Sequence, residues 1–465
     1  MIRPPEDRFR VWRRLAVGVT TVAALALAPV AASAQSLIRD AEIEATLRAD
    51  SEPIFRAAGL NPADVKINIV NDAELNAFVA GGQQVFLNTG MILATENPDQ
   101  LRGVIAHEAG HIAGGHIARS GDAMRAGIQP LILTLALGAL AAFAGRPDAG
   151  AAILSSSNYF ATLSVLSYSR VQESAADQAA LGYLQTAGYS GRGLADFFRQ
   201  YQFQEVFSQA RRYSYFQSHP ISSERVAALR TRVDAASNRD RTPSAESVER
   251  HTVMKAKLDA FLRPPGHTFV RYPESDTRFA ARYARAIAYF RDAQPDRSIT
   301  MIDALIAEHP DNPYLWELKG QINFESGRIA ASEAPYRRAV ALAPENPLLR
   351  VGLAQTLVAL GPTKFDDAIA NLQHSLARER DNPLGWRLLG QAYDGKNMPG
   401  LARLAAAEEH FHGNDLRGAF TFATRARALL AAGTPDHRRA TDIVMASEPT
   451  QRELREMARE ERVGG

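Results

Sequence analysis

Two histidines four positions apart, with a glutamate directly after the first, constrain this chain more than any other feature. The segment reads His107-Glu108-Ala109-Gly110-His111. On an α-helix, side chains four positions apart differ by only about 40° around the axis, so both imidazoles lie on one face and can bind one metal ion. Such a string also occurs by chance on ordinary amphipathic helices, so a metal site also requires further ligands elsewhere in the chain.

The glutamate in this segment indicates hydrolytic chemistry. In zinc peptidases with this pattern, the carboxylate beside the first histidine does not bind the metal and instead removes a proton from the attacking water. We therefore expect His107 and His111 to bind one zinc ion per chain and Glu108 to act as general base. The same ligands can also hold cobalt or manganese in vitro.

A catalytic zinc ion needs a third protein ligand and one open coordination position. His116 stands one position before the third histidine of the longer three-histidine pattern. On a continuing helix it would lie on the far side from His107. We therefore interpret His116 as a structural histidine or as a neighbour of a ligand.

Glu173 and Asp177 lie four positions apart in an alanine-rich segment and are the second candidate group. They could form a solvated acidic helix face. The small residues around them instead indicate a closely packed helix, and a buried carboxylate needs a metal or a partner. We predict that Glu173 is the third zinc ligand and that Asp177 accepts the free N–H of a ligating histidine, which fixes its tautomer.

His219 and Arg225 follow in a segment where Pro220 stiffens the loop. His219 could stabilise the oxyanion of the transition state, or it could occupy the open position of zinc in a resting state and make the enzyme latent. Arg225 could hold this loop by pairing with a carboxylate or could bind the oxyanion itself. For both residues the alternative is an ordinary surface turn.

A short β-strand is predicted ahead of the zinc helix, over Val85-Phe86-Leu87-Asn88. In a zinc peptidase of this kind, an exposed edge strand can pair with the main chain of an extended substrate. We expect residues 85–88 to form such an edge strand and to pair with the substrate main chain, which would give sequence-tolerant binding of peptides.

Together these motifs resemble one family. HExxH is followed by ExxxD on a separate helix, a glycine-then-strand segment over 82–90 precedes both, and a His-Pro-x4-Arg element ends at Arg225. This order resembles the gluzincin family of HtpX, the CAAX prenyl protease and BepA-like periplasmic proteases. The resemblance covers about residues 60–230.

Residues 1–34 are predicted to be a cleaved secretory signal peptide. Arginines precede an apolar run from Leu15 to Ala32, and Ala32-Ser33-Ala34 is a small-x-small cleavage site. A membrane anchor is the alternative. We expect a periplasmic protein, and the absence of cysteine means that it forms no disulfides and has no thiolate zinc ligands.

The charge balance argues against a nucleic-acid partner. The whole chain has a formal net charge of +2, and residues 1–34 contribute +3 (five Arg, two acidic residues), which leaves −1 for the remainder. A phosphate-binding protein normally has a basic surplus or a basic patch.

An apolar stretch runs from Leu131 to Ala144, between the histidine motif and Glu173. It is shorter than the roughly 20 residues that span a bilayer. We expect it to emerge near the zinc site as a lid, as part of the core or as a segment in peripheral contact with a membrane.

Beyond about residue 265 the sequence becomes repetitive. Asn-Pro pairs recur at Asn312, Asn346 and Asn382, which are 34 and 36 positions apart. This is the period of tetratricopeptide helix pairs. Seven positions after each proline there is a small residue where paired helices cross: Gly320, Ala354 and Gly390.

We therefore expect a mainly α chain with a small β-sheet. A zincin-type metallopeptidase domain over 35–265 would be followed by an α-solenoid of tetratricopeptide (TPR) repeats over 275–430 and by a polar helix or tail over 431–465. A solenoid of this kind has a concave surface suited to binding partners.

The family resemblance implies an endopeptidase that cleaves unfolded or stalled outer-membrane proteins and contacts the barrel assembly machinery through its repeats. The main alternative is a TPR chaperone or scaffold whose protease site is latent. An intramembrane relative of the prenyl protease is disfavoured because the chain after the predicted signal peptide has no stretch suited to span a membrane.

Overall fold

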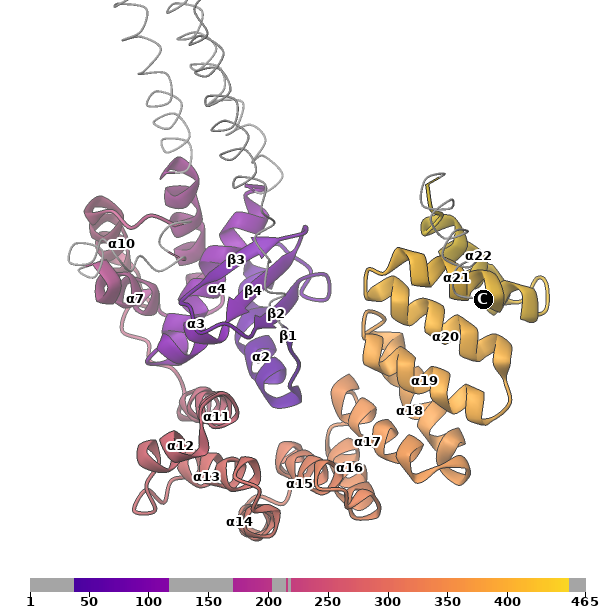
Figure 1. Ribbon diagram of the computed structural model, residues 1–465. Coiled ribbons are helices and arrows are strands. Elements are labelled where there is room, and N and C mark those ends of the chain that lie inside the picture. The colour runs from indigo at the N-terminus through magenta and orange to yellow at the C-terminus, as the bar shows by residue number, and fades with distance from the viewer. Residues whose placement is uncertain (1–36, 117–169, 203–214, 216–218, 451–465) are drawn as a thin grey trace, which may run out of the picture.

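The computed structural model describes residues 37–116, 170–202, 215 and 219–450. These residues are mainly helical and include one small sheet, as the sequence predicts (Figure 1). The predicted signal peptide, the apolar stretch 131–144 and the chain end from residue 451 lie outside the described residues. Within the described ranges, no helix has the length and apolar character needed to cross a membrane.

The sheet has four strands in the order β1-β2-β4-β3. β2 and β4 are parallel, whereas β1 and β3 are antiparallel to their neighbours. Val85 and Leu87 of β4 are fully buried because their side chains point into the core beneath the sheet. The strands are β1 (Leu37–Ile38), β2 (Lys66–Val70), β3 (Ala77–Ala80) and β4 (Gln84–Asn88).

The strand predicted over 85–88 is present, but the expectation that it is an edge strand is wrong. β4 lies between β2 and β3, so its backbone groups pair on both sides. β3 is the outer strand on this side. Alternation of apolar residues identifies a strand but carries no information about its place in the sheet.

Helix α4 (Pro98–Ala113) carries the histidine motif. Asn97 caps the helix by accepting a hydrogen bond from the backbone N–H of Gln100, and Pro98 occupies the first turn, where no N–H is needed. Every residue from Pro98 to His111 is buried. The polar residues of the motif therefore lie inside the protein and need partners there.

The other helices of the first domain surround α4 and the sheet (Figure 1). A hydrophobic core joins α4 to strand residues such as Ile69 and Val85 and to Phe197 of a later helix. The helices are α2 (Ala41–Ala57), α3 (Thr89–Ala94), the helical residues 170–186, α7 (Arg192–Gln202) and α10 (Ser223–Ala235).

The repeated Asn-Pro pairs mark helix starts, and the predicted TPR-type helix pairs are present. The side chains of Asn312, Asn346 and Asn382 each accept a backbone N–H of the first turn, and the following proline takes the first helical position. A Cβ on Gly320 would come within 2.7 Å of the Tyr336 ring. The small residue therefore permits the close crossing of two paired helices.

Helices α13 to α22 form the curved solenoid (Figure 1). They are α13 (Phe279–Arg291), α14 (Pro295–Glu308), α15 (Pro313–Glu325), α16 (Ile329–Leu342), α17 (Pro347–Leu360), α18 (Phe365–Arg378), α19 (Pro383–Gly395), α20 (Pro399–His412), α21 (Leu416–Leu429) and α22 (Pro435–Ala446), with a short 3-10 turn over Pro362–Lys364.

The last of these helices differs from the expected solvated tail. Ala440 and Ile443 of α22 are fully buried against apolar residues of α20 and α21. The helix is polar overall, and the two buried residues are too few to produce a strong apolar pattern in the sequence. The solenoid packing therefore continues to about residue 446.

The two parts of the chain share helix α11 (Ala245–Leu262). Met254 and Leu258 belong to the core of the first domain, whereas Val253 and Ala256 belong to the core of the solenoid. A short helix, α12 (Pro265–Arg271), follows. Farther along, ion pairs join Arg39 to Glu379 and Lys66 to Asp381, so the solenoid also contacts the first domain near β1 and β2.

Candidate metal centre

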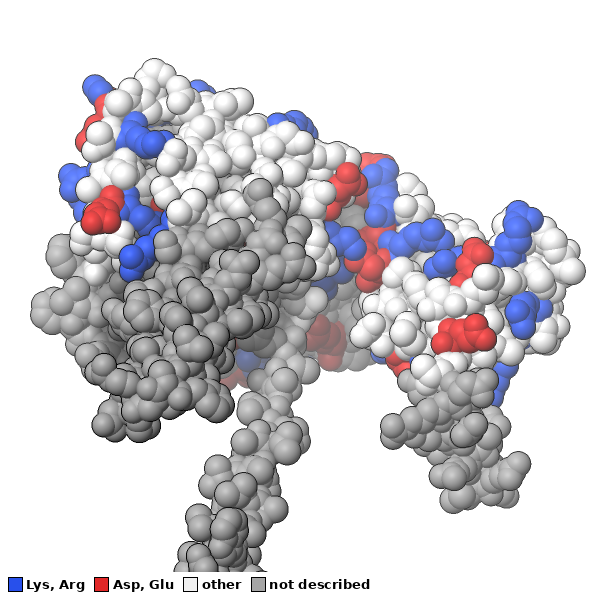
Figure 2. All heavy atoms as spheres, turned by 90° about the horizontal axis from the view of Figure 1, so that it is seen from above, with Lys and Arg blue, Asp and Glu red and all other residues white. Residues whose placement is uncertain are grey.

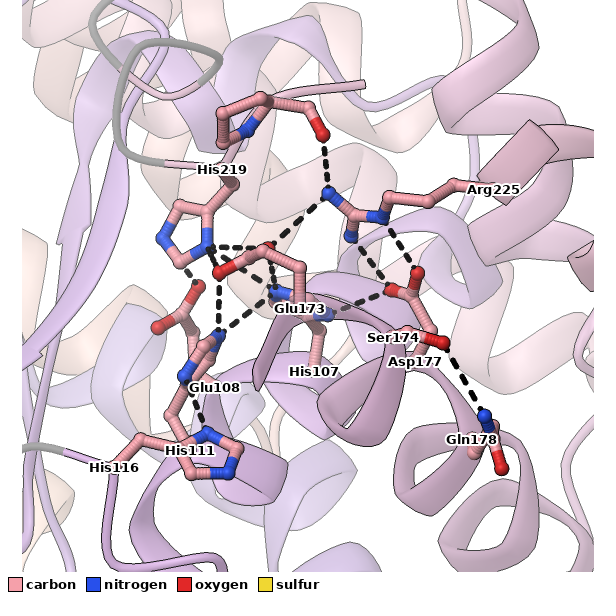
Figure 3. A network of polar contacts seen from close by, with 11 residues as sticks. His107, Glu108, His111, His116, Glu173, Ser174, Asp177, Gln178, His219 and Arg225 are labelled. Atoms are coloured by element: carbon pink, nitrogen blue, oxygen red, sulfur yellow. Dashed lines mark hydrogen bonds and ion pairs between the residues drawn. The ribbon is translucent and has the colours of Figure 1, made fainter. Parts of the chain in front are cut away.

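A close crossing of α4 with the helical segment 170–186 brings the motif residues together. A Cβ on Gly110 would lie 2.9 Å from the carbonyl oxygen of Ala176, so a residue larger than glycine would force the helices apart. The crossing places His107 and His111 of one helix against Glu173 of the other (Figure 3). Two distant parts of the sequence thus form one site.

Four donor groups converge at this crossing: His107, His111, Glu173 and His219. Each is buried, and each can offer one ligand atom within 4.8 Å of all the others. His107 Nε2 lies 3.1 Å from His111 Nε2 and 3.2 Å from Glu173 Oε2. His219 Nδ1 lies 3.2 Å from His107 Nε2 and 3.1 Å from Glu173 Oε2.

These separations fit one small cation. Ligand atoms at about 2.0–2.1 Å from a tetrahedral zinc ion stand about 3.3–3.4 Å apart. His111 Nε2 and Glu173 Oε1 are 3.3 Å apart, and the separations given above are 3.1–3.2 Å. Imidazole nitrogens and a carboxylate oxygen are also the ligand types that zinc prefers among residues other than cysteine. The donor set is therefore suited to a divalent transition metal.

Asp177 and Arg225 contact the donor residues on the side that faces away from the point where the donor atoms converge. Asp177 Oδ1 lies 3.0 Å from His107 Nδ1, the ring nitrogen that faces away from the other donors. Arg225 donates to both oxygens of Asp177, from Nε at 2.8 Å and from Nη2 at 2.9 Å. Its Nη1 donates to the Pro220 carbonyl at 2.6 Å and lies 3.2 Å from Glu173 Oε2. Arg225 thus ties the loop of His219 to the acidic pair (Figure 3).

The charges at the site favour a cation between the donors. Burial alone would raise the pKa of Glu173, but its contacts with the three histidines hold that pKa far below its usual range. Burial likewise opposes the ionisation of Asp177, whose pKa is lowered by His107 and Arg225. For His107, burial lowers the pKa while Asp177 and Glu173 raise it to about 10. The two ionised carboxylates therefore attract positive charge, as a proton or as a metal ion.

Glu108 stands beside the donor group and is nearly inaccessible, with 1% of its surface exposed. Neither carboxylate oxygen has a hydrogen-bond partner among the described residues. Its Oε1 lies 3.6 Å from His219 Nε2, which is beyond hydrogen-bonding distance. Because an unpaired buried carboxylate is costly, this arrangement suits a group that binds a water molecule or part of a substrate.

Comparisons with known proteins identify the two parts of the chain. A family model described as peptidase family M48 matches residues 39–233, and one described as tetratricopeptide repeat matches residues 283–347. The chain carries an M48 peptidase domain followed by TPR repeats. The matched M48 range contains the complete donor group. The chain is a metalloendopeptidase.

Two curated relatives match most of the chain, and a third matches a shorter stretch. The chain is 25% identical over 382 residues to the beta-barrel assembly-enhancing protease of Yersinia pestis, covering 80% of this chain and 76% of that protein. It is 25% identical over 374 residues to the protein of the same name from Escherichia coli K12, covering 79% and 75%. The metalloprotease LoiP of Escherichia coli K12 is 29% identical over 175 residues, covering 37% of this chain and 64% of LoiP.

A solved structure, the APC/C hetero-tetramer Cut9-Hcn1, aligns to 75% of this chain and 90% of that chain with 13% identity and a TM-score of 0.22.

Two further residues, His116 and Tyr215, contact histidines of the donor group. His116 Nδ1 lies 3.0 Å from His111 Nδ1, so His116 contacts the ring from the side opposite the donor group, in keeping with its interpretation as a neighbour of a ligand. The buried Tyr215 ring lies 4.7 Å from the His219 ring, and its backbone carbonyl accepts the His219 N–H at 2.8 Å. Tyr215 was not predicted from the sequence; the only signal is its position four residues before His219.

Replacing Asp177 with asparagine should weaken metal binding by the M48 domain by about 10–100-fold, the usual cost of losing an outer carboxylate partner of a ligating histidine. The neutral amide would no longer match the charges of Arg225 and the His107 ring. Competition with a chromogenic chelator measures the change, and Asp234→Asn on the exposed face of α10 is the control. Equal affinities in the two variants would remove Asp177 from the metal centre.

Proposed function

We propose that this chain is an exported zinc endopeptidase that cleaves unfolded or misassembled envelope proteins in the periplasm. The observation that carries the proposal is the buried group of His107, His111 and Glu173 with the unpaired carboxylate of Glu108 beside it. The names of the relatives, which match the chain through both domains, support a part in outer-membrane protein assembly. Residues 1–34 would direct export and be removed.

The residues divide the chemistry as follows. His107, His111 and Glu173 would hold the zinc ion, which when bound polarises the scissile carbonyl and makes water more acidic. Glu108 takes a proton from the attacking water and delivers it to the leaving amine. Asp177 keeps the His107 ring in the tautomer that leaves Nε2 free for the ion. Arg225 fixes the position of Asp177 and of the loop that carries His219.

The solenoid would bring clients or partner proteins to the M48 domain. Such surfaces bind extended or helical segments of other proteins, and the barrel assembly machinery is the partner we propose. Substrate selection would then rest on recruitment, because main-chain pairing with an edge strand is tolerant of sequence. We assign this pairing to β3, one of the two outer strands of the sheet, since β4 is paired on both sides.

A second candidate function is a TPR chaperone or scaffold whose protease site is latent. The position of His219 favours it: its Nδ1 lies within hydrogen-bonding distance of both His107 and Glu173, where a fourth ligand would stand. A site with four steady protein ligands has no position left for water. Release of the His219 loop would convert this state into the active one.

Replacing His219 with alanine separates these functions. If His219 is a resting fourth ligand, the variant should retain metal and cleave an unfolded protein at least several-fold faster than the parent. If His219 instead stabilises the oxyanion, cleavage should fall by about 10–1,000-fold with metal retained. His267→Ala on α12 is the matched control, because that imidazole is half-exposed and remote from the donor group. Loss of the metal itself would make His219 an essential ligand and contradict both roles.

A chelator distinguishes an enzyme from a scaffold. We expect chelation to abolish cleavage of an unfolded outer-membrane protein while the helical circular dichroism signal persists, and added zinc to restore the activity. A metal that is needed only to keep the chain folded, with no cleavage in any state, would support the scaffold.

A further inference from the structure

A buried cluster of charges joins the M48 domain to the first repeat. Lys257 of α11 has only 1% of its side chain exposed, and three carboxylates surround its ammonium group. Asp40 and Glu42 belong to the start of α2 in the M48 domain, whereas Glu317 belongs to α15 of the solenoid. One ammonium group therefore faces three acids from both domains, and the cluster would carry a net charge of −2 if all were ionised.

The three acids are not equally satisfied. Lys257 Nζ lies 2.9 Å from Asp40 Oδ2 and 3.2 Å from Glu42 Oε2. Asp40 also accepts the backbone N–H groups of Glu42 and Ile43 as the cap of α2. Glu42 accepts a further hydrogen bond from the Tyr283 hydroxyl, at 2.9 Å. Asp40 and Glu42 thus receive the donors that stabilise an ionised carboxylate.

Glu317 receives none of these hydrogen bonds. Its Oε2 lies 3.6 Å from Lys257 Nζ, is shielded from solvent and has no hydrogen-bond partner among the described residues. The side chain keeps 18% of its surface exposed, but burying Oε2 without a hydrogen bond favours the neutral form of the carboxyl group. The nearby charges of Asp40 and Glu42 act in the same direction, and only Lys257 opposes them.

From this geometry we propose that Glu317 is protonated when the solenoid is docked on the M48 domain, which makes the docking of the two domains dependent on pH. The acid would act as a sensor at the junction, remote from the metal centre. The docked arrangement would be most stable in mildly acidic conditions and would loosen as the pH rises.

The pKa values of the clustered groups support a loss of docking stability as the pH rises. Burial raises the pKa of Glu317 to about 7, with Lys257 opposing and Asp40 and Glu42 adding to the rise. Burial also raises the pKa of Glu42, but Lys257 and the Tyr283 hydroxyl oppose that rise, whereas Glu317 has no such hydroxyl donor. Lys257 stays charged, because the acids hold its pKa well above its usual range although burial alone would lower it. Tyr283, Tyr314 and Tyr336, the phenols near the cluster, have raised pKa values and remain neutral.

The sign of the effect follows from proton linkage. Glu317 binds its proton more tightly in the docked form than in an exposed one, whose pKa is near 4.5. Its stabilisation of docking is therefore complete below about pH 4.5 and is lost as the pH rises through about 7. One such proton changes the docking equilibrium constant by at most about tenfold per pH unit within that window.

The absence of cysteine makes the test direct. Cysteines in place of the exposed Arg56 of α2 and Gln391 of α19 would carry a fluorescent donor and acceptor, one on each domain. Energy transfer is then followed through a urea titration of the full chain at pH 5, 6, 7 and 8. The urea midpoint for separation of the labels reports the stability of docking even where the docked form predominates.

We expect the midpoint in the labelled parent to fall from pH 5 to about pH 7 and to change little between pH 7 and pH 8. Glu317→Gln keeps the shape of the side chain but removes the group that titrates, so the urea midpoint of this variant should change much less with pH. The matched control is Glu325→Gln, an exposed acid on the same helix, which should follow the parent. A midpoint independent of pH in the parent, or equal pH dependence in Glu317→Gln and the parent, would overturn the proposal.

Discussion

Replacing Glu108 with glutamine is expected to lower peptide hydrolysis by at least about a hundredfold while leaving metal binding unchanged. General-base catalysis contributes about 10²–10⁴-fold to a rate, and the amide cannot accept the proton of water. Glu108 is not one of the four residues whose donor atoms converge, so the affinity for metal should be preserved. The variant also removes an unpaired buried charge, so its thermal stability should equal or exceed that of the parent.

Hydrolysis of a fluorogenic peptide beside the zinc content of each preparation measures this effect. Glu96→Gln, an exposed glutamate ahead of α4, is the matched control and should keep full activity. Cleavage by Glu108→Gln within about threefold of the parent, at equal zinc content, would require a different base and would remove Glu108 from the mechanism.

Replacing Glu173 with glutamine is expected to lower both metal affinity and activity, by a larger factor than the roughly 10–100-fold of an outer-partner substitution. Glu173 is the carboxylate of the donor group, and its two oxygens lie 3.1–3.3 Å from nitrogens of three histidines. The neutral amide is a poor zinc ligand and leaves the charge of Arg225 less well matched. The same substitution at Glu224, exposed on α10, should change neither quantity.

Direct titration of the metal-free protein with zinc tests this expectation. Parent and Glu224→Gln should bind one zinc ion each with the same affinity, and Glu173→Gln should bind it much more weakly. Unchanged affinity in Glu173→Gln would assign the third ligand to His219 and leave Glu173 as a structural partner of the histidines.

Much of the fold could be predicted from the sequence, because several structural features depend only on residues that are close together in the chain. The four-residue spacing of His107 and His111 fixes their common face on a helix, and the small residues around Glu173 indicated a close packing partner. The Asn-Pro pairs combine a helix cap with a first-turn proline, so their recurrence indicated the repeats. Each of these signals depends on a few neighbouring residues.

Features that depend on distant parts of the chain could not be predicted in this way. The place of β4 inside the sheet follows from its pairing with β2 and β3, which no single segment encodes. Arg225 contacts Asp177 across 48 positions, and the sequence left two roles open for it. Lys257 looks like an ordinary helix lysine, and only the assembled domains reveal three acids around it.

The most direct test of the proposed peptidase function is the mass spectrum of fragments from an unfolded outer-membrane barrel protein incubated with the zinc-loaded full chain. We predict cuts at internal positions of the substrate that disappear with a chelator and return with added zinc. An intact substrate, with one zinc ion bound per chain and with His219→Ala equally inactive, would contradict the peptidase and favour the scaffold.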